Sequence, residues 1–68
     1  MNLTLIETFA AVMKTGSTTR AAALLGVSQP AVSRAIRRLE DTTRLKLFER
    51  SGPRIAATRE AELLYREV

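Results

Sequence analysis

Residues 26–40, GVSQPAVSRAIRRLE, decide the fold of this 68-residue chain. Gly26 is suited to end a helix in a left-handed turn, and Ser28 is a good N-cap for the next helix. Pro30 then falls in the first turn, where its missing amide hydrogen costs little. After it, apolar residues recur on one side of the helix at the 3.6-residue period, at Val32, Ala35, Ile36 and Leu39. The stretch therefore predicts a helix that packs by one face and exposes polar and cationic residues on the other.

Two shorter helices precede this stretch. Apolar residues at helical spacing predict a first helix from about Thr4 to Thr15, which ends at Gly16. Ser17 can cap a second helix of about two turns that ends at Gly26. The core of the three helices is expected to contain Leu5, Phe9, Val12, Leu24, Leu25, Val32, Ile36 and Leu39. Two short helices joined by a tight turn with glycine form the arrangement that enters the major groove of DNA.

A hairpin and a further helix are predicted after the third helix. Leu45 to Arg50 and Arg54 to Ala57 flank the turn-forming triplet 51–53, which suits a short β-hairpin, the candidate wing. Phe48 is expected to pack in the core rather than to stack on a base. Thr58 can cap a last helix. The expected fold class is mainly α, a winged helix-turn-helix with a three-helix core, a short β-hairpin wing and the start of a C-terminal helix.

The excess of positive charge is local. From Gln29 to Arg54 there are seven basic residues and three acidic ones, which accounts for the whole net charge of +4. A surface that meets phosphates has this electrostatic footprint. Charge alone leaves an ordinary solvated face about equally possible, and one exposed arginine is more often only solvated. The clustering of these residues on the third helix favours contact with nucleic acid.

Position on the third helix assigns the expected roles. Gln29 can reach the paired donor and acceptor of adenine, Arg34 can pair with the two acceptors of guanine, and Pro30 can pack on a thymine methyl group. The expected base readers are Gln29, Pro30, Ser33 and Arg34. The expected phosphate contacts are Ser17, Thr19, Ser28, Arg37, Arg38 and Arg50. Pro53 and Arg54 at the hairpin tip are candidates for the minor groove.

Other classes of function find little support in the composition. The chain contains no histidine and no cysteine, so thiolate metal sites and the usual proton shuttle are excluded, and we expect no cofactor, no metal and no enzyme activity. There is no apolar run that could cross a bilayer and no secretion signal, so we expect a cytoplasmic protein without a membrane partner. The alternative is an adaptor whose working surface is the apolar stripe of the last helix, at Ala61, Leu64, Tyr65 and Val68.

The chain resembles the N-terminal domain of the LysR-type transcriptional regulators of bacteria. The matching residues are Phe9, Val12, Gly16-Ser17, Ala21-Ala22, Leu25, the run Val27 to Arg34, Ile36, Leu39-Glu40, Leu47-Phe48, Arg50 and Thr58. The resemblance implies that the start of the third helix contacts bases, that the wing reaches an adjacent groove, and that the helix after the wing mediates dimerisation. It also implies a ligand-sensing C-terminal domain beyond this module.

The resemblance divides the chain into two parts and names its partners. Residues 1–57 are expected to form the winged helix-turn-helix DNA-binding domain, and residues 58–68 the start of a linker helix for dimerisation. The implied partner is duplex DNA with an interrupted inverted repeat, at the nucleoid in the bacterial cytoplasm. The full-length protein is expected to be a homodimer. Because so short a closing helix is marginal in water, the fragment is expected to be a weak dimer or a monomer.

Several positions depart from the family pattern. Thr43-Arg44 stands where Leu-Gly is usual, so the third helix lacks its glycine terminator. Pro53 stands where a basic residue is usual, and alternation turns Arg54, one place later, to the opposite face. Thr18 replaces an aromatic residue, and Ala61 replaces a glycine. Residues 58–61 and 63–68 look most like the branch that regulates opine or amino-acid metabolism.

Overall fold

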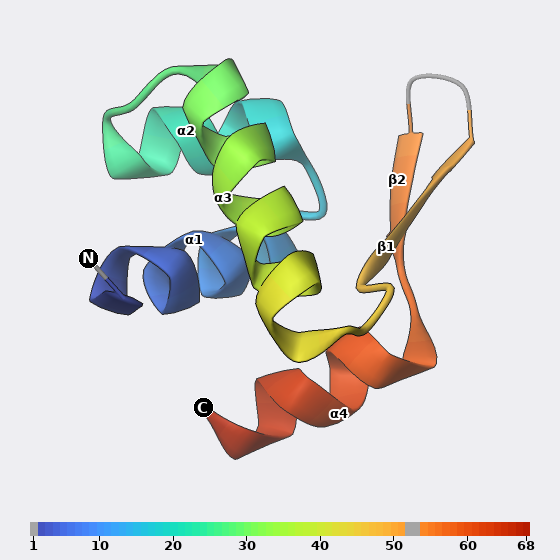
Figure 1. Ribbon diagram of the computed structural model, residues 1–68. Coiled ribbons are helices and arrows are strands. Elements are labelled where there is room, and N and C mark those ends of the chain that lie inside the picture. The colour runs from blue at the N-terminus through green and yellow to red at the C-terminus, as the bar shows by residue number, and fades with distance from the viewer. Residues whose placement is uncertain (1, 52–53) are drawn as a thin grey trace.

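Three helices carry a two-stranded hairpin and a fourth helix in the computed structural model, which describes residues 2–51 and 54–68 (Figure 1). In chain order the elements are α1 (Asn2–Thr15), α2 (Thr18–Leu25), α3 (Gln29–Thr43), β1 (Phe48–Ser51), β2 (Arg54–Ala57) and α4 (Arg59–Glu67). The first three helices each pack against the other two. The expected fold class, a mainly α winged helix-turn-helix, is confirmed.

Local capping explains where the helices begin. The Ser17 hydroxyl accepts a hydrogen bond from the amide of Arg20 at the start of α2, and the Ser28 hydroxyl accepts one from Ala31 at the start of α3. Thr58 caps α4 in the same way. Each of these bonds satisfies an amide that has no partner within its helix. All three predicted caps are confirmed, whereas α1 begins at Asn2, two residues before its predicted start.

The helix α3 ends without the glycine that is usual at this position. Arg44 adopts the left-handed conformation that a glycine usually takes after a helix, with φ of 60°. The Thr43 hydroxyl donates to the carbonyl oxygen of Leu39 at 2.8 Å and accepts from the amide of Leu45 at 3.3 Å. These bonds hold the turn in place, so α3 ends at Thr43 without a glycine, at the cost of backbone strain in a residue with a Cβ.

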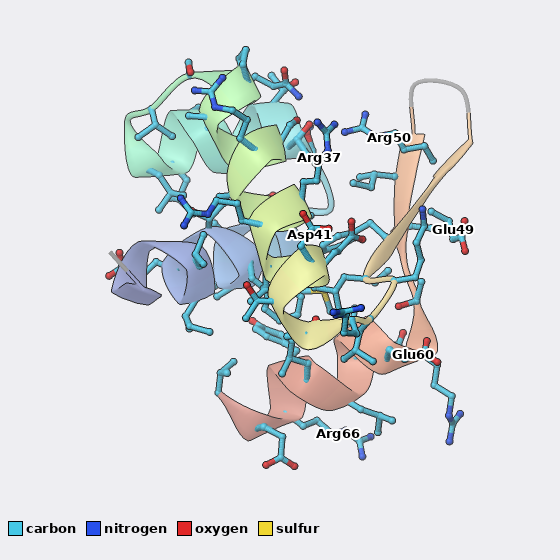
Figure 2. The ribbon with its side chains drawn as sticks, viewed as in Figure 1. Arg37, Asp41, Glu49, Arg50, Glu60 and Arg66 are labelled. Atoms are coloured by element: carbon cyan, nitrogen blue, oxygen red, sulfur yellow. The ribbon has the colours of Figure 1, made fainter. Side chains whose placement is uncertain are left out.

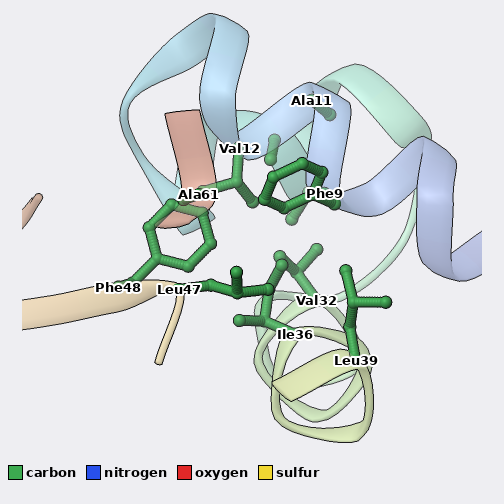
Figure 3. Close-up of a cluster of buried hydrophobic side chains, with 11 residues drawn as sticks. Phe9, Ala11, Val12, Val32, Ile36, Leu39, Leu47, Phe48 and Ala61 are labelled. Atoms are coloured by element: carbon green, nitrogen blue, oxygen red, sulfur yellow. The ribbon is translucent and has the colours of Figure 1, made fainter. Parts of the chain in front are cut away.

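One apolar cluster joins all the elements (Figure 3). Its largest fully buried side chains are Phe9, Val12, Val32 and Leu47. Phe48 is buried beside Phe9 with the ring centroids 6.0 Å apart, so its predicted packing role is confirmed. The prediction that Leu24 belongs to the core is wrong, because this side chain is 59% exposed. Ala21, Ala22 and Leu25 form the inner face of α2, and the helical period turns Leu24 away from them.

The hairpin is shorter than its sequence pattern suggests. Its strands are antiparallel, with Phe48 opposite Ala57 and Ser51 opposite Arg54. The predicted first strand begins at Leu45, but β1 begins at Phe48, because the amide of Leu47 donates to the carboxylate of Glu40 in α3 instead of to a strand. The predicted second strand agrees with β2.

The predicted apolar stripe of α4 is divided between the core and the surface. Ala61 has no exposed surface, so it is a core residue and cannot contact a second chain as predicted. Leu64 is half-buried against the core, and the Tyr65 ring packs edge-on to Phe9 with centroids 6.1 Å apart. Val68 remains 56% exposed. The first two turns of α4 therefore hold this helix against the domain, because their apolar face is used within the chain.

Replacing Arg44 by glycine should stabilise the fold. We expect Arg44→Gly to raise the free energy of unfolding by about 0.5 to 1 kcal/mol, because glycine adopts a positive φ without the Cβ penalty. Arg38→Gly, at an exposed position inside α3, should lower it by about as much. Urea denaturation measures both. Lower stability for Arg44→Gly would contradict the left-handed turn.

Candidate nucleic-acid interface

The two faces of α3 have opposite characters. Val32, Ile36 and Leu39 are buried against the core, as predicted. On the other side Pro30, Arg34, Arg37 and Arg38 are exposed, while Gln29 and Ser33 are half-buried at the N-terminal turn. The structure thus places all four predicted base readers within the first two turns of α3, with Pro30 and Arg34 exposed and Gln29 and Ser33 at the edge of the packed face.

The Gln29 side chain is already hydrogen-bonded. Its amide nitrogen Nε2 donates to Oγ1 of Thr18 at 3.0 Å and to Oγ of Ser33 at 2.9 Å. Two of the predicted base readers therefore form one polar network with the first residue of α2. Sequence reasoning missed the role of Thr18, because the contact joins residues 11 positions apart and no local pattern signals it.

A hollow lies between α3 and the hairpin, and basic side chains line it. Arg37 and Lys46 contribute to its lining, together with Arg50 of β1, and the carboxylates of Glu40 and Glu49 line it as well. Figure 2 shows Arg37 and Arg50 pointing toward one another across this space. Two guanidinium groups that face one hollow favour an anion between them, such as a phosphate oxygen. Lys46 was not among the predicted contacts.

A second hollow is lined by the start of α2 and by Arg50, which also lines the first hollow. Ser17, Thr19 and Arg20 line it, and so does Arg50. The structure therefore brings together the predicted phosphate contacts Ser17, Thr19 and Arg50, with Arg37 in the adjoining hollow. Arg38 lines neither of these hollows, and Ser28 lies at the cap of α3.

Glu40 fixes the start of the hairpin relative to α3. One oxygen of its half-buried carboxylate, Oε2, accepts hydrogen bonds from the amides of Leu47 at 2.8 Å and Phe48 at 3.2 Å. Because β1 begins at Phe48, these bonds hold the strand that carries Arg50. Thr58 holds the same segment through two further bonds, since its hydroxyl donates to the carbonyl oxygen of Lys46 and its amide to that of Leu47. The position of the hairpin thus depends on polar contacts that the sequence pattern did not predict.

The predicted minor-groove residues belong to the hairpin tip. Pro53 lies outside the described residues. The backbone of Arg54 pairs with that of Ser51 at the end of the hairpin ladder.

Neither a metal site nor a membrane span is found in residues 2–51 and 54–68. No group of three or more histidine, cysteine, aspartate or glutamate side chains there could hold a metal ion. No helix in this part of the chain combines the length and the apolar character needed to cross a membrane.

Comparison with known proteins places the chain among bacterial regulators. A family model described as bacterial regulatory helix-turn-helix protein, lysR family, matches residues 3–62. The octopine catabolism/uptake operon regulatory protein OccR of Rhizobium meliloti is 53% identical over 68 residues, which are all of this chain and 23% of that protein. The regulatory protein NocR of Agrobacterium fabrum is 52% identical over 63 residues, which are 93% of this chain and 21% of NocR. The chain therefore spans about a fifth of the length of these relatives.

Solved structures similar to this chain include two complexes with DNA. The complex of the BenM DNA-binding domain with catB site 1 DNA matches with a TM-score of 0.91 at 34% identity, over 98% of this chain and 75% of that chain. The complex of the CbnR DNA-binding domain with DNA matches with a TM-score of 0.92 at 31% identity, over 98% of this chain and 77% of that chain.

Removal of the Glu40 carboxylate should loosen the hairpin. We expect Glu40→Ala to lower the free energy of unfolding by about 1 to 3 kcal/mol, because two backbone amides lose their acceptor in a half-buried position. Hydrogen exchange at Leu47 and Phe48 should accelerate. Asp41→Ala, which removes an exposed carboxylate from the same turn, should change stability by less than about 0.5 kcal/mol. Equal stability of the two variants, with unchanged exchange at both amides, would contradict this role.

Proposed function

The chain belongs to the lysR family of bacterial regulatory helix-turn-helix proteins, and we propose that it is a DNA-binding domain that reads specific sequences in duplex DNA. One observation carries this proposal. The first turns of α3 present Pro30 and the cationic side chains of Arg34 and Arg37 outward, while the apolar face of the helix fixes it to the core. An exposed helix start of this kind fits the major groove. The solved complexes of similar domains with DNA support the same partner.

Base recognition is assigned to the first two turns of α3. Arg34 donates from its guanidinium to O6 and N7 of a guanine, which is the most common specific contact in the major groove. Pro30 packs on a thymine methyl group, and Gln29 and Ser33 present polar groups to a neighbouring base. The exposure of Pro30 and Arg34 supports these roles.

Phosphate contacts surround this turn. Arg37 and Arg50 face one hollow, and Ser17 and Thr19 line the next. Arg38 on the exposed side of α3 and Ser28 at its cap complete the proposed set. These contacts fix the position of α3 on the duplex without reading sequence. The hairpin tip, with Pro53 and Arg54, is proposed to approach the adjacent minor groove.

Dimerisation is assigned to α4 and whatever follows it in the full-length protein. Leu63 and Val68 are 49% and 56% exposed, and Tyr65 and Leu64 are partly so, which leaves apolar surface for a second copy. We propose that residues 1–57 form the DNA-binding domain and that residues 58–68 form the start of the linker helix. A two-fold dimer would bind two half-sites of an interrupted inverted repeat.

The proposed role is binding rather than catalysis, and the proposed place is the bacterial nucleoid. The curated relatives are regulatory proteins, which supports the first point. The second follows from the proposed partner, because chromosomal DNA lies in the bacterial cytoplasm. The octopine regulator among the relatives is in keeping with the opine branch suggested by the sequence, so promoters of opine or amino-acid genes are the proposed targets.

Arg34 and Arg37 should differ in what their loss changes. With a duplex selected by the chain and a scrambled duplex, we expect Arg34→Ala to reduce the difference in binding free energy between them by about 1 to 3 kcal/mol. Arg37→Ala should weaken both complexes alike and reduce the slope of log affinity against log salt by about one. Fluorescence anisotropy at about 50 to 200 mM salt measures both quantities.

Arg66→Ala is the matched control, because it removes an exposed arginine from α4 and should change neither quantity. Equal affinity of the unmodified chain for random and selected DNA at every salt concentration would refute sequence reading. Charge reversal at Arg34 and Arg37 should abolish DNA binding, whereas an adaptor that works through α4 would tolerate it.

The isolated chain should be monomeric or a weak dimer. The helix α4 comprises nine residues and uses half of its apolar face within the domain, so little surface remains for a stable interface. Sedimentation equilibrium at micromolar concentration measures the state. A tight dimer at that concentration would show that this segment of α4 suffices for assembly and would contradict the expectation.

A further inference from the structure

The carboxamide of Gln29 is held between two helices before any DNA arrives. Nε2 donates to Oγ1 of Thr18, the first residue of α2, and to Oγ of Ser33, one turn further along α3. All three side chains are half-buried. A glutamine amide nitrogen carries two hydrogens, and its oxygen only accepts. With both hydrogens engaged, Oε1 is the group of Gln29 that remains for a base.

We propose that the Thr18 hydroxyl determines which bases Gln29 accepts, by holding the amide nitrogen away from them. This inference rests on the proposed function, in which the α3 N-terminal turn faces base edges. An acceptor in the major groove pairs with an amino group, and adenine N6 and cytosine N4 are the two amino groups there. In this orientation Oε1 of Gln29 accepts a hydrogen bond from the amino group of adenine or cytosine on the contacted strand. Guanine and thymine present acceptors at the corresponding positions and are disfavoured.

Release of the amide nitrogen changes this selection. An unrestrained glutamine makes a paired contact with adenine, donating to N7 while accepting from N6, and cytosine has no counterpart to N7 at that position. Loss of the Thr18 bond leaves Nε2 with its contact to Ser33 and one free hydrogen. The freed hydrogen is what the adenine contact requires. Thr18 is thus a positioning residue that acts through Gln29 and need not touch DNA.

Thr18 suits this task better than Ser33 does. Ser33 lies on the same helix as Gln29, four residues on, so its bond holds the side chain only along α3. Thr18 comes from α2 and ties the amide to a second point in the fold. Ser33 is itself among the proposed base readers, so only Thr18 allows a test in which the contact with DNA is left untouched.

Nuclear magnetic resonance of the free chain tests the held amide directly. Gln29 is the sole glutamine and Asn2 the sole asparagine, so a nitrogen–proton correlation spectrum shows two side-chain amide pairs. In the unmodified chain and in Thr18→Ser, which keeps the hydroxyl, the Gln29 pair should be shifted from the free-glutamine position and exchange slowly with water. In Thr18→Val, which keeps the shape but lacks the hydroxyl, the pair should move toward free glutamine. An identical Gln29 pair in all three chains would overturn the proposal.

Selection from a duplex library with a randomised segment tests the consequence for DNA. The position read by Gln29 is the one at which Gln29→Ala loses its preference. There the unmodified chain and Thr18→Ser should select adenine and cytosine within about threefold of each other, since each offers one donor. Thr18→Val should favour adenine over cytosine by about tenfold, the gain expected of a paired contact. Thr42→Val, an exposed position near the far end of α3, should match the unmodified chain.

The two proposals fail in different ways. An unmodified chain that selects no base at any position contradicts sequence reading, and the inference falls with it. A clear preference of the unmodified chain that Thr18→Val leaves unchanged contradicts the role of Thr18 alone. Thermal melting monitors folding of each variant, and Thr18→Ala provides a second chain without the hydroxyl should Thr18→Val fold poorly.

Discussion

The packing of one face of α3 against α1 and α2 is the constraint on which the rest of the structure depends. Val32, Ile36 and Leu39 are buried there, and each contributes about 1.5 to 3 kcal/mol by leaving water. The Ser28 cap contributes about 1 kcal/mol. The packed face therefore fixes the rotation of α3 about its axis, whereas the cap fixes where the helix begins. Once that rotation is set, the helical period leaves no choice about which side chains point away from the core.

The hairpin derives its position from the same helix. Glu40 lies one turn beyond Ile36 on the inner side of α3, and its carboxylate holds the amides that precede β1. Thr43 and Arg44 then turn the chain toward that carboxylate. The basic residues of the two elements thus face a common hollow because short polar contacts link the elements, in a domain too small for a large core to do so.

Local patterns in the sequence predict most of the helices and strands of the fold. Ser17, Ser28 and Thr58 are caps whose partners lie three residues away, so a local pattern predicts them. Contacts between elements were beyond such reasoning. Nothing near Thr18 or Glu40 in the sequence indicates the bonds they form 7 to 11 residues away. Leu24 and Ala61 were misplaced for the same reason, because the neighbouring elements decide which apolar side chains of a short helix are covered.

The sequence predicts the candidate site as a set of residues and not as an arrangement. The helical period placed Gln29, Pro30, Ser33 and Arg34 on one side, but it could not reveal that the Gln29 amide is already engaged. The most direct measurement is the structure of the chain bound to a duplex that it selects. The account predicts the N-terminal turn of α3 inside the major groove, with Gln29 and Arg34 within hydrogen-bond distance of base edges. A duplex bound to α4 or α1, with this turn facing solvent, would contradict it.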